Sequence, residues 1–305
     1  VLAETLDVVV VSVDYRLAPE TRFPGAVEDC YAALGWLVAN AGEFGVDAAR
    51  IGIMGESAGG GLAAGLALLV RDRGEYALAF QHLIYPMIDD RTCTQPDPHP
   101  YAGEFIWTHQ SNIFGWTALL GAAPGGDDVS PYAAAARATD LTRLPPTYIA
   151  TGALDLFLEE NLEYARRLTR AGVPVELHVY PGAFHAFQFA TDSALSKTAW
   201  LDSQRALERA ECCARTEHPR AVPGTAWPRR QCTLRRPCAT QPLAQRQGSQ
   251  FHQRLERGFD RIGRMGVIDK DLRAVLARGG TLHPPAHAGQ LGQDVEHARG
   301  FISRR

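Results

Sequence analysis

The 305-residue chain has no long hydrophobic run. Its longest apolar stretch without a charged residue, Ala58 to Val70, has only thirteen residues. Because a helix needs about 20 apolar residues to cross a bilayer, the sequence predicts no membrane-spanning segment and no membrane partner. No secretory signal is visible either, so we expect a cytoplasmic protein.

Cysteine is scarce, and its spacing does not suit a metal site. None of the six cysteines forms a C-x₂-C pair, and His283 and His287 lack the glutamate of the H-E-x-x-H zinc motif. The first 210 residues contain two isolated cysteines, Cys30 and Cys93. We expect each to be a buried thiol or a surface residue. The other four are in the tail, at Cys212, Cys213, Cys232 and Cys238. We therefore predict no metal and no disulfide framework.

Charge divides the chain at about residue 210. Residues 1–210 carry a formal charge of −12 and residues 211–305 one of +9, and the tail holds 16 arginines but a single lysine. A basic tail can bind nucleic acid, a polar and charged tail can be a disordered extension, and this composition is also typical of GC-rich DNA read out of frame. The last two explanations lead us to predict no nucleic-acid partner, and few contacts between the tail and residues 1–210.

The segment Gly55-Glu56-Ser57-Ala58-Gly59-Gly60 matches the G-x-S-x-G motif. It follows an apolar run, Ile51 to Met54, and opens a helix of small residues, Ala58 to Val70. A strand, a sharp turn and a helix in this order expose the serine hydroxyl of a nucleophile elbow. The alternative is a glycine-rich turn with an incidental serine. The motif makes Ser57 a candidate nucleophile and the backbone N–H of Ala58 a candidate oxyanion donor.

Two possible partners for Ser57 follow it in the chain. Asp155 comes just after an apolar strand, Pro146 to Gly152, and His185 follows another strand, Val173 to Tyr180. The order Ser, Asp, His is that of α/β-hydrolases, and ligands gather at the C-terminal ends of such strands. Taken singly, Asp155 could instead cap the next helix, and His185 could be an ordinary surface or core histidine. Together they predict a catalytic triad in which His185 is the base and Asp155 orients it.

The chain resembles the hormone-sensitive-lipase-like branch of the α/β-hydrolases, which includes many bacterial esterases. Five segments carry the resemblance in the right order: Val11 to Glu20, Phe23 to Asp29, Gly55 to Gly60, Asp155 to Glu160, and His185 to Phe187. The resemblance covers about residues 1–210. It implies hydrolysis of small-molecule carboxylic esters through an acyl-serine, with no cofactor, a short-to-medium acyl chain as the default substrate, and structural roles for Arg16 and Glu20.

One feature of that family has no counterpart in this sequence. Its members carry a His-Gly-Gly-Gly loop whose N–H groups build most of the oxyanion hole, and no such segment occurs among the 305 residues. The first seven residues are similar to the end of the helix that follows that loop. We therefore expect an N-terminally truncated hydrolase with Ala58 as its remaining oxyanion donor, and little activity from this chain.

The segment between the elbow and Asp155 interrupts the alternation of strands and helices. His82 to Pro86 is predicted to be a core strand, whereas residues 87–135 form a cap-like insertion around one helix, Phe105 to Leu120. In that helix Ile106, Ile113, Trp116 and Leu120 fall at helical spacing. By the resemblance this insertion covers the acyl pocket, so Trp107 and Trp116 are candidate substrate contacts, although aromatic residues at such spacing are more often core.

The sequence thus predicts an α/β fold. Residues 1–210 should form a partial α/β-hydrolase domain with a mostly parallel sheet and flanking helices, followed by an irregular basic extension, 211–305. Two alternatives remain for the hydrolase domain: a non-catalytic relative that binds small molecules, or a peptidase or amidase with the same triad. The presence of Ser57, Asp155 and His185 argues against the binding protein, since a receptor does not need all three.

Overall fold

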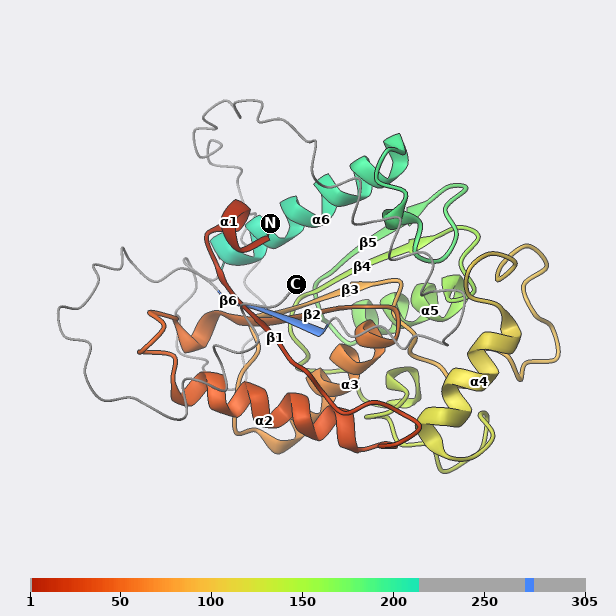
Figure 1. Cartoon of the computed structure of the whole chain (residues 1–305), viewed down its shortest axis with the longest axis horizontal. Coiled ribbons are helices and arrows are strands. Elements are labelled where there is room, and N and C mark those ends of the chain that lie inside the picture. The colour runs from red at the N-terminus through yellow and green to blue at the C-terminus, as the bar shows by residue number, and fades with distance from the viewer. Residues whose placement is uncertain (1, 214–271, 277–305) are drawn as a thin grey trace.

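The computed structural model describes residues 2–213 and 272–276 of the chain. Its sheet has six strands in the order β1 (Val9–Ser12), β6 (Leu272–Leu276), β2 (Ile51–Glu56), β3 (Phe80–Ile84), β4 (Thr147–Gly152) and β5 (Val175–Tyr180). Strands β2 to β5 are parallel. The helices are α1 (Leu2–Leu6), α2 (Gly25–Ala39), α3 (Ser57–Arg73), α4 (His109–Leu120), α5 (Leu158–Arg170) and α6 (Ala194–Cys213), as Figure 1 shows.

The central strands are buried on both faces. Every residue of β3 and β4 is buried, as are Ile51 to Gly55 in β2. Continuous apolar runs of this kind are typical of parallel strands covered by helices on both sides. The predicted α/β class and parallel sheet are confirmed.

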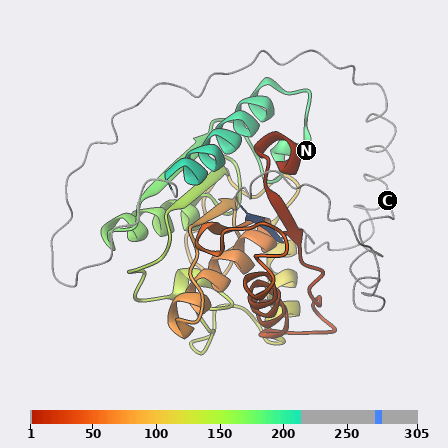
Figure 2. The ribbon, with the colours of Figure 1, turned by 90° about the vertical axis from the view of Figure 1, so that its left-hand side faces the viewer.

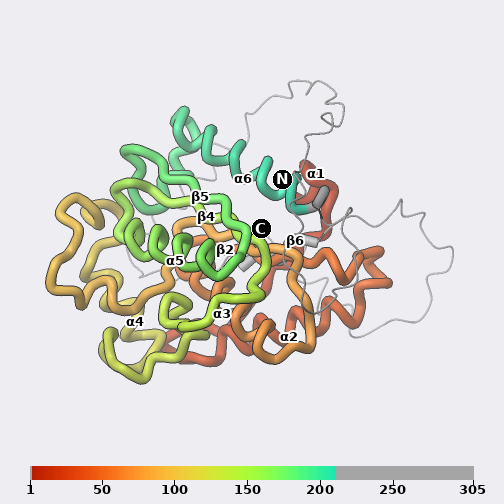
Figure 3. The backbone as a smooth tube through the Cα atoms, turned by 180° about the vertical axis from the view of Figure 1, so that it is seen from behind, coloured from red at the N-terminus to blue at the C-terminus, as the bar shows by residue number. Residues whose placement is uncertain are grey.

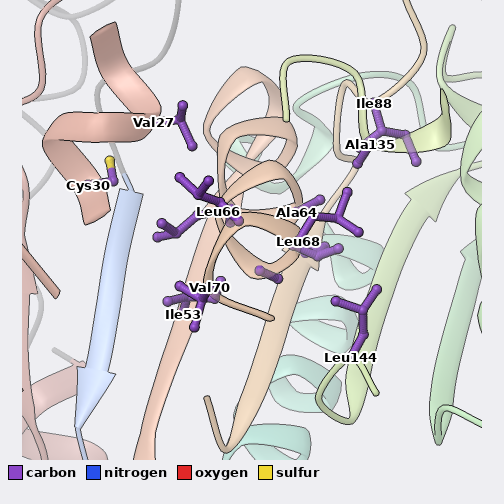
Figure 4. Close-up of a cluster of buried hydrophobic side chains, with 14 of the residues drawn as sticks. Val27, Cys30, Ile53, Ala64, Leu66, Leu68, Val70, Ile88, Ala135 and Leu144 are labelled. Carbon is purple, nitrogen blue, oxygen red and sulfur yellow. The ribbon is translucent and has the colours of Figure 1, made fainter. Parts of the chain in front are cut away.

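Helices cover both faces of the sheet, so that the molecule has three layers (Figure 2). On one face α2, α3 and α5 form the largest core. Figure 4 shows Val27 of α2 and Leu66 of α3 in this core, to which α5 adds Leu168. On the other face α6 packs through Ala199 and Ala206 against β3 to β5. Seen from behind, α6 lies on one side of the strands and α2 and α3 on the other (Figure 3).

Strand β6 is a point of contact between the basic tail and the sheet. We predicted few contacts between residues 211–305 and residues 1–210, and in the described part of the tail Leu272–Leu276 pairs antiparallel with both β1 and β2. A strand at this place gives hydrogen-bond partners to the facing backbone groups of β1 and β2, which would otherwise be left unpaired inside the fold. The tail at 214–271 and 277–305, with Cys232, Cys238, His283 and His287, lies outside the described residues, as do the side chains of Cys212 and Cys213.

The helix of the 87–135 segment begins later than the sequence suggested. Helix α4 starts at His109, because the Thr108 side chain caps it by accepting a hydrogen bond from Ser111 N. Ile106, expected on the buried face of the helix, lies before it with a φ of 64° and is 61% exposed. Ile113 is also exposed, whereas Trp116 is buried.

Candidate active site

The turn at Ser57 has the strained backbone expected of an elbow. Strand β2 ends at Glu56, helix α3 begins at Ser57, and Ser57 has a φ of 55°. A positive φ in a residue other than glycine costs on the order of 1–3 kcal/mol. Gly55 must lack a side chain, because a Cβ there would collide with the Gly59 carbonyl. The glycines therefore permit the turn, and the turn presents the Ser57 hydroxyl.

Ser57, His185 and Asp155 lie in one hydrogen-bonded line. Ser57 Oγ is 2.9 Å from His185 Nε2, and His185 Nδ1 is 2.9 Å from Asp155 Oδ2. Asp155 is fully buried and His185 is 4% exposed, whereas Ser57 is partly exposed. The structure thus brings together the three residues that the sequence singled out, with the hydroxyl at the accessible end.

The Asp155 carboxylate uses its two oxygens for different partners. Oδ1 accepts a hydrogen bond from Phe157 N, which fixes the turn after β4, and Oδ2 faces His185. Helix α5 starts only at Leu158, with Phe157 as its N-cap residue, so the alternative that Asp155 caps the helix does not describe its position. The turn therefore aims Asp155 at the imidazole.

Two other carboxylates, Glu56 beside the nucleophile and Asp89 after β3, face different partners. Asp89 forms a bidentate ion pair with Arg91, and Glu56 accepts a 3.5 Å hydrogen bond from the Tyr85 hydroxyl. Asp155 is the carboxylate that contacts the His185 ring.

Three aromatic rings surround His185. The Phe157 ring meets it edge to face at 5.1 Å between centroids, the Tyr85 ring lies at 4.9 Å, and the Trp107 ring at 6.2 Å. Such contacts restrict the orientation of a buried ring. Of these rings, sequence analysis missed Tyr85 and Phe157. Phe157 could have been predicted to lie near the site, because it follows Asp155 by two residues. No residue pattern near Tyr85 indicated that it contacts His185.

A largely apolar cavity opens beside Ser57. It holds about 790 Å³, including the solvent at its mouth, and Ser57, Ala58, Trp107 and Trp116 all contribute to its wall. Both tryptophans proposed as substrate contacts thus line the cavity that contains the Ser57 hydroxyl. Further walls come from α3, from α4 and from the segment after β1, through Leu62, Leu119, Tyr15 and Phe23.

Arg16 has the structural role expected of it. Its guanidinium forms a bidentate ion pair with Asp29 of α2, with contacts of 2.8 and 2.9 Å. The backbone N–H of Arg16 also donates a hydrogen bond to Asp29 Oδ2. These bonds tie the segment after β1 to α2 and so shape one wall of the cavity.

The described residues contain no cluster of three or more histidine, cysteine or acidic side chains that could hold a metal ion. Cys30 is a buried thiol and Cys93 is half-buried. Within residues 2–213 and 272–276, we find no helix with the length and apolar character needed to cross a bilayer. The cytoplasmic location stays a prediction.

A family model for the alpha/beta hydrolase fold matches residues 1–189. The chain belongs to this family. Among curated relatives, it is 36% identical over 191 residues to esterase LipI of Mycobacterium tuberculosis, an alignment covering 59% of this chain and 56% of LipI. It is 34% identical over 187 residues to an ethyl acetate hydrolase of Pseudomonas putida, covering 61% and 58% of the two chains. The chain therefore spans little more than half the length of these relatives.

Solved structures agree with this assignment. A bacterial heroin esterase is 47% identical with a TM-score of 0.62, over 64% of this chain and 62% of that one. An esterase of Pyrobaculum calidifontis is 35% identical with the same TM-score, over 68% of each chain. These matches place the chain among the hormone-sensitive-lipase-like bacterial esterases that the sequence resembles.

Proposed function

We propose that the protein is a serine carboxylesterase that hydrolyses small esters through an acyl-serine intermediate. The observation that carries the proposal is the line of 2.9 Å contacts from Ser57 Oγ through His185 to Asp155. The esterase activity named for its relatives supports it.

In this proposal the three side chains divide the work. Ser57 Oγ attacks the ester carbonyl while His185 Nε2 takes its proton, and the protonated ring then gives that proton to the leaving alcohol. Water repeats the cycle on the acyl-serine, with His185 again as the base. Asp155 holds the ring in the required tautomer and stabilises the imidazolium.

The oxyanion of the tetrahedral intermediate needs backbone donors. The Ala58 N–H follows the nucleophile directly, in the first turn of helix α3, which supports its proposed role as one donor. Since the 305 residues contain no His-Gly-Gly-Gly segment, we propose slow turnover for this chain assayed by itself. Loss of a single oxyanion donor typically lowers turnover about 10²–10³-fold.

The apolar cavity favours a short-to-medium acyl chain as substrate. Trp107 and Trp116 are proposed as its contacts, since both line the cavity beside Ser57. The name of the Pseudomonas putida relative, an ethyl acetate hydrolase, points to the same size class.

A substrate panel tests the proposal against its alternatives. We expect p-nitrophenyl acetate, butyrate and hexanoate to be hydrolysed, p-nitroanilides of the same acids to be poor substrates, and the variant Ser57→Ala to hydrolyse none of them. Faster cleavage of the anilides would indicate an amidase or peptidase. Saturable binding of an ester without Ser57-dependent turnover would indicate a binding protein.

A further inference from the structure

Glu160 and Asn161 lie in α5, five and six residues after Asp155, and both side chains are buried. Neither touches Ser57 or His185 in any of the contacts described above. Buried polar side chains are normally hydrogen-bonded, and the partners of these two lie in a single stretch of chain, the segment after β3 from Pro86 to Thr92. This stretch is here called the 86–92 connector.

Glu160 holds the connector by its backbone. Its Oε1 accepts hydrogen bonds from Ile88 N at 2.7 Å and Asp89 N at 3.3 Å, and its Oε2 accepts one from the Thr92 hydroxyl. Asn161 adds a fourth bond, because its Nδ2 donates to the Pro86 carbonyl at 2.8 Å.

On its other side the connector packs directly against the nucleophile elbow. Met87 N donates a 3.0 Å hydrogen bond to the Ser57 carbonyl. No side chain fits between the connector and α3: a Cβ at Gly60 would lie 2.9 Å from Pro86 Cβ, and one at Gly61 would collide with the Met87 carbonyl. A shift of Pro86 and Met87 is therefore passed directly to Ser57.

Given the proposed esterase function, on which this inference rests, we propose that Glu160 and Asn161 are positioning residues that hold Ser57 in reach of His185. The first turn of α5 is fixed to Asp155 by the hydrogen bond from Leu158 N to the Asp155 carbonyl, 3.1 Å long. The same turn grips the connector, and the connector supports Ser57. The first turn of α5 thus fixes the positions of both the acid and the nucleophile, although the two lie far apart in the chain.

The grip depends on the reach of Glu160 rather than on its charge. Burial raises the pKa of Glu160 well above its usual value, against the opposing effect of the bonds from Thr92 and Ile88. A protonated carboxyl can keep the same contacts, since Oε1 still accepts both N–H groups while the other oxygen donates to Thr92. A glutamine side chain has the same length and the same pattern of one acceptor and one donor. An aspartate keeps the charge but is one methylene too short to reach Ile88 N.

The test compares Glu160→Gln, Glu160→Asp and Glu160→Ala in the full 305-residue chain, with Glu159→Ala as the control. Glu159 is the exposed neighbour of Glu160 in the same helical turn. Two rates are measured per folded molecule: hydrolysis of p-nitrophenyl butyrate, and inactivation by a fluorophosphonate that labels Ser57. Near-ultraviolet circular dichroism establishes the folded fraction of each variant.

We expect Glu160→Gln and Glu159→Ala to stay within about threefold of the wild type. Glu160→Asp and Glu160→Ala should lower kcat and the labelling rate by about 10–10²-fold with little change in KM, the effect of displacing a reacting group by about 1 Å. If Glu160→Ala does not fold, Glu160→Asp decides.

Wild-type rates in folded Glu160→Asp would overturn the proposal, as would a Glu160→Gln variant as slow as Glu160→Asp. Absence of Ser57-dependent hydrolysis in the wild type would instead overturn the esterase function itself.

Discussion

Asp155 Oδ2 lies 2.9 Å from His185 Nδ1, and both side chains are buried. We expect Asp155→Asn to lower kcat by about 10⁴-fold, because an amide stabilises the wrong tautomer of the imidazole while leaving the geometry intact. Steady-state kinetics with p-nitrophenyl butyrate measures the effect. Asp89→Asn is the matched control, since Asp89 pairs with Arg91 instead. A larger loss in Asp89→Asn than in Asp155→Asn would reassign the acid.

The Asp90–Arg137 pair should matter for stability. Asp90 is fully buried, its two oxygens lie 2.7 and 2.8 Å from the Arg137 guanidinium, and it also accepts a hydrogen bond from Gly125 N. Asp90→Ala leaves Arg137, whose side chain is only 12% exposed, without its partner, so we expect the free energy of unfolding to fall by up to about 3–5 kcal/mol. Glu163→Ala, which breaks the exposed pair with Arg166, should cost at most about 1 kcal/mol. Urea unfolding compares them, and equal losses would contradict this account.

The burial of the His82 ring should make the free energy of unfolding depend on pH. It is 1% exposed, stacks on Tyr148 with ring centroids 4.2 Å apart, and hydrogen-bonds Ser203 at 2.8 Å. Burial lowers its pKa from 6.5 to about 3. Between these values the unfolded chain binds the proton and the folded one does not, so stability falls as the pH drops through this window.

The contribution of His82 should reach about 2 kcal/mol between pH 7.5 and pH 5, because each pH unit below the unfolded pKa is worth about 1.4 kcal/mol. In His82→Gln the loss of stability over this range should be smaller by that amount. Urea unfolding at several pH values measures it. Parallel curves for the two proteins would show that His82 does not stay neutral in the fold.

The sequence predicted the features that depend on local residue patterns, namely the turn at Ser57 and the strands that precede Asp155 and His185. The glycines around Ser57 indicated a sharp turn and so a nucleophile elbow. The apolar runs before Asp155 and His185 indicated buried strands. Their juxtaposition followed from the rule that ligands gather at the C-terminal ends of parallel strands. That rule needs no knowledge of side-chain packing.

Features that depend on distant partners were missed. Leu272–Leu276 pairs with strands more than 200 residues away, and nothing in its five residues indicates which strands they will pair with. The start of α4 depended on the Thr108 cap, where apolar spacing had suggested a start at Phe105. The hydrogen bonds of Glu160 to the 86–92 connector likewise form only once the fold brings α5 against the segment after β3.

The most direct test of the central claim is the hydrolysis of p-nitrophenyl butyrate by the 305-residue chain and by Ser57→Ala, each normalised to folded protein. This account predicts slow turnover that depends on Ser57, and faster turnover when a family-like His-Gly-Gly-Gly segment is added at the N-terminus. Hydrolysis that persists in Ser57→Ala, or its absence both with and without the added segment, would contradict the assignment of Ser57 as the nucleophile of an esterase.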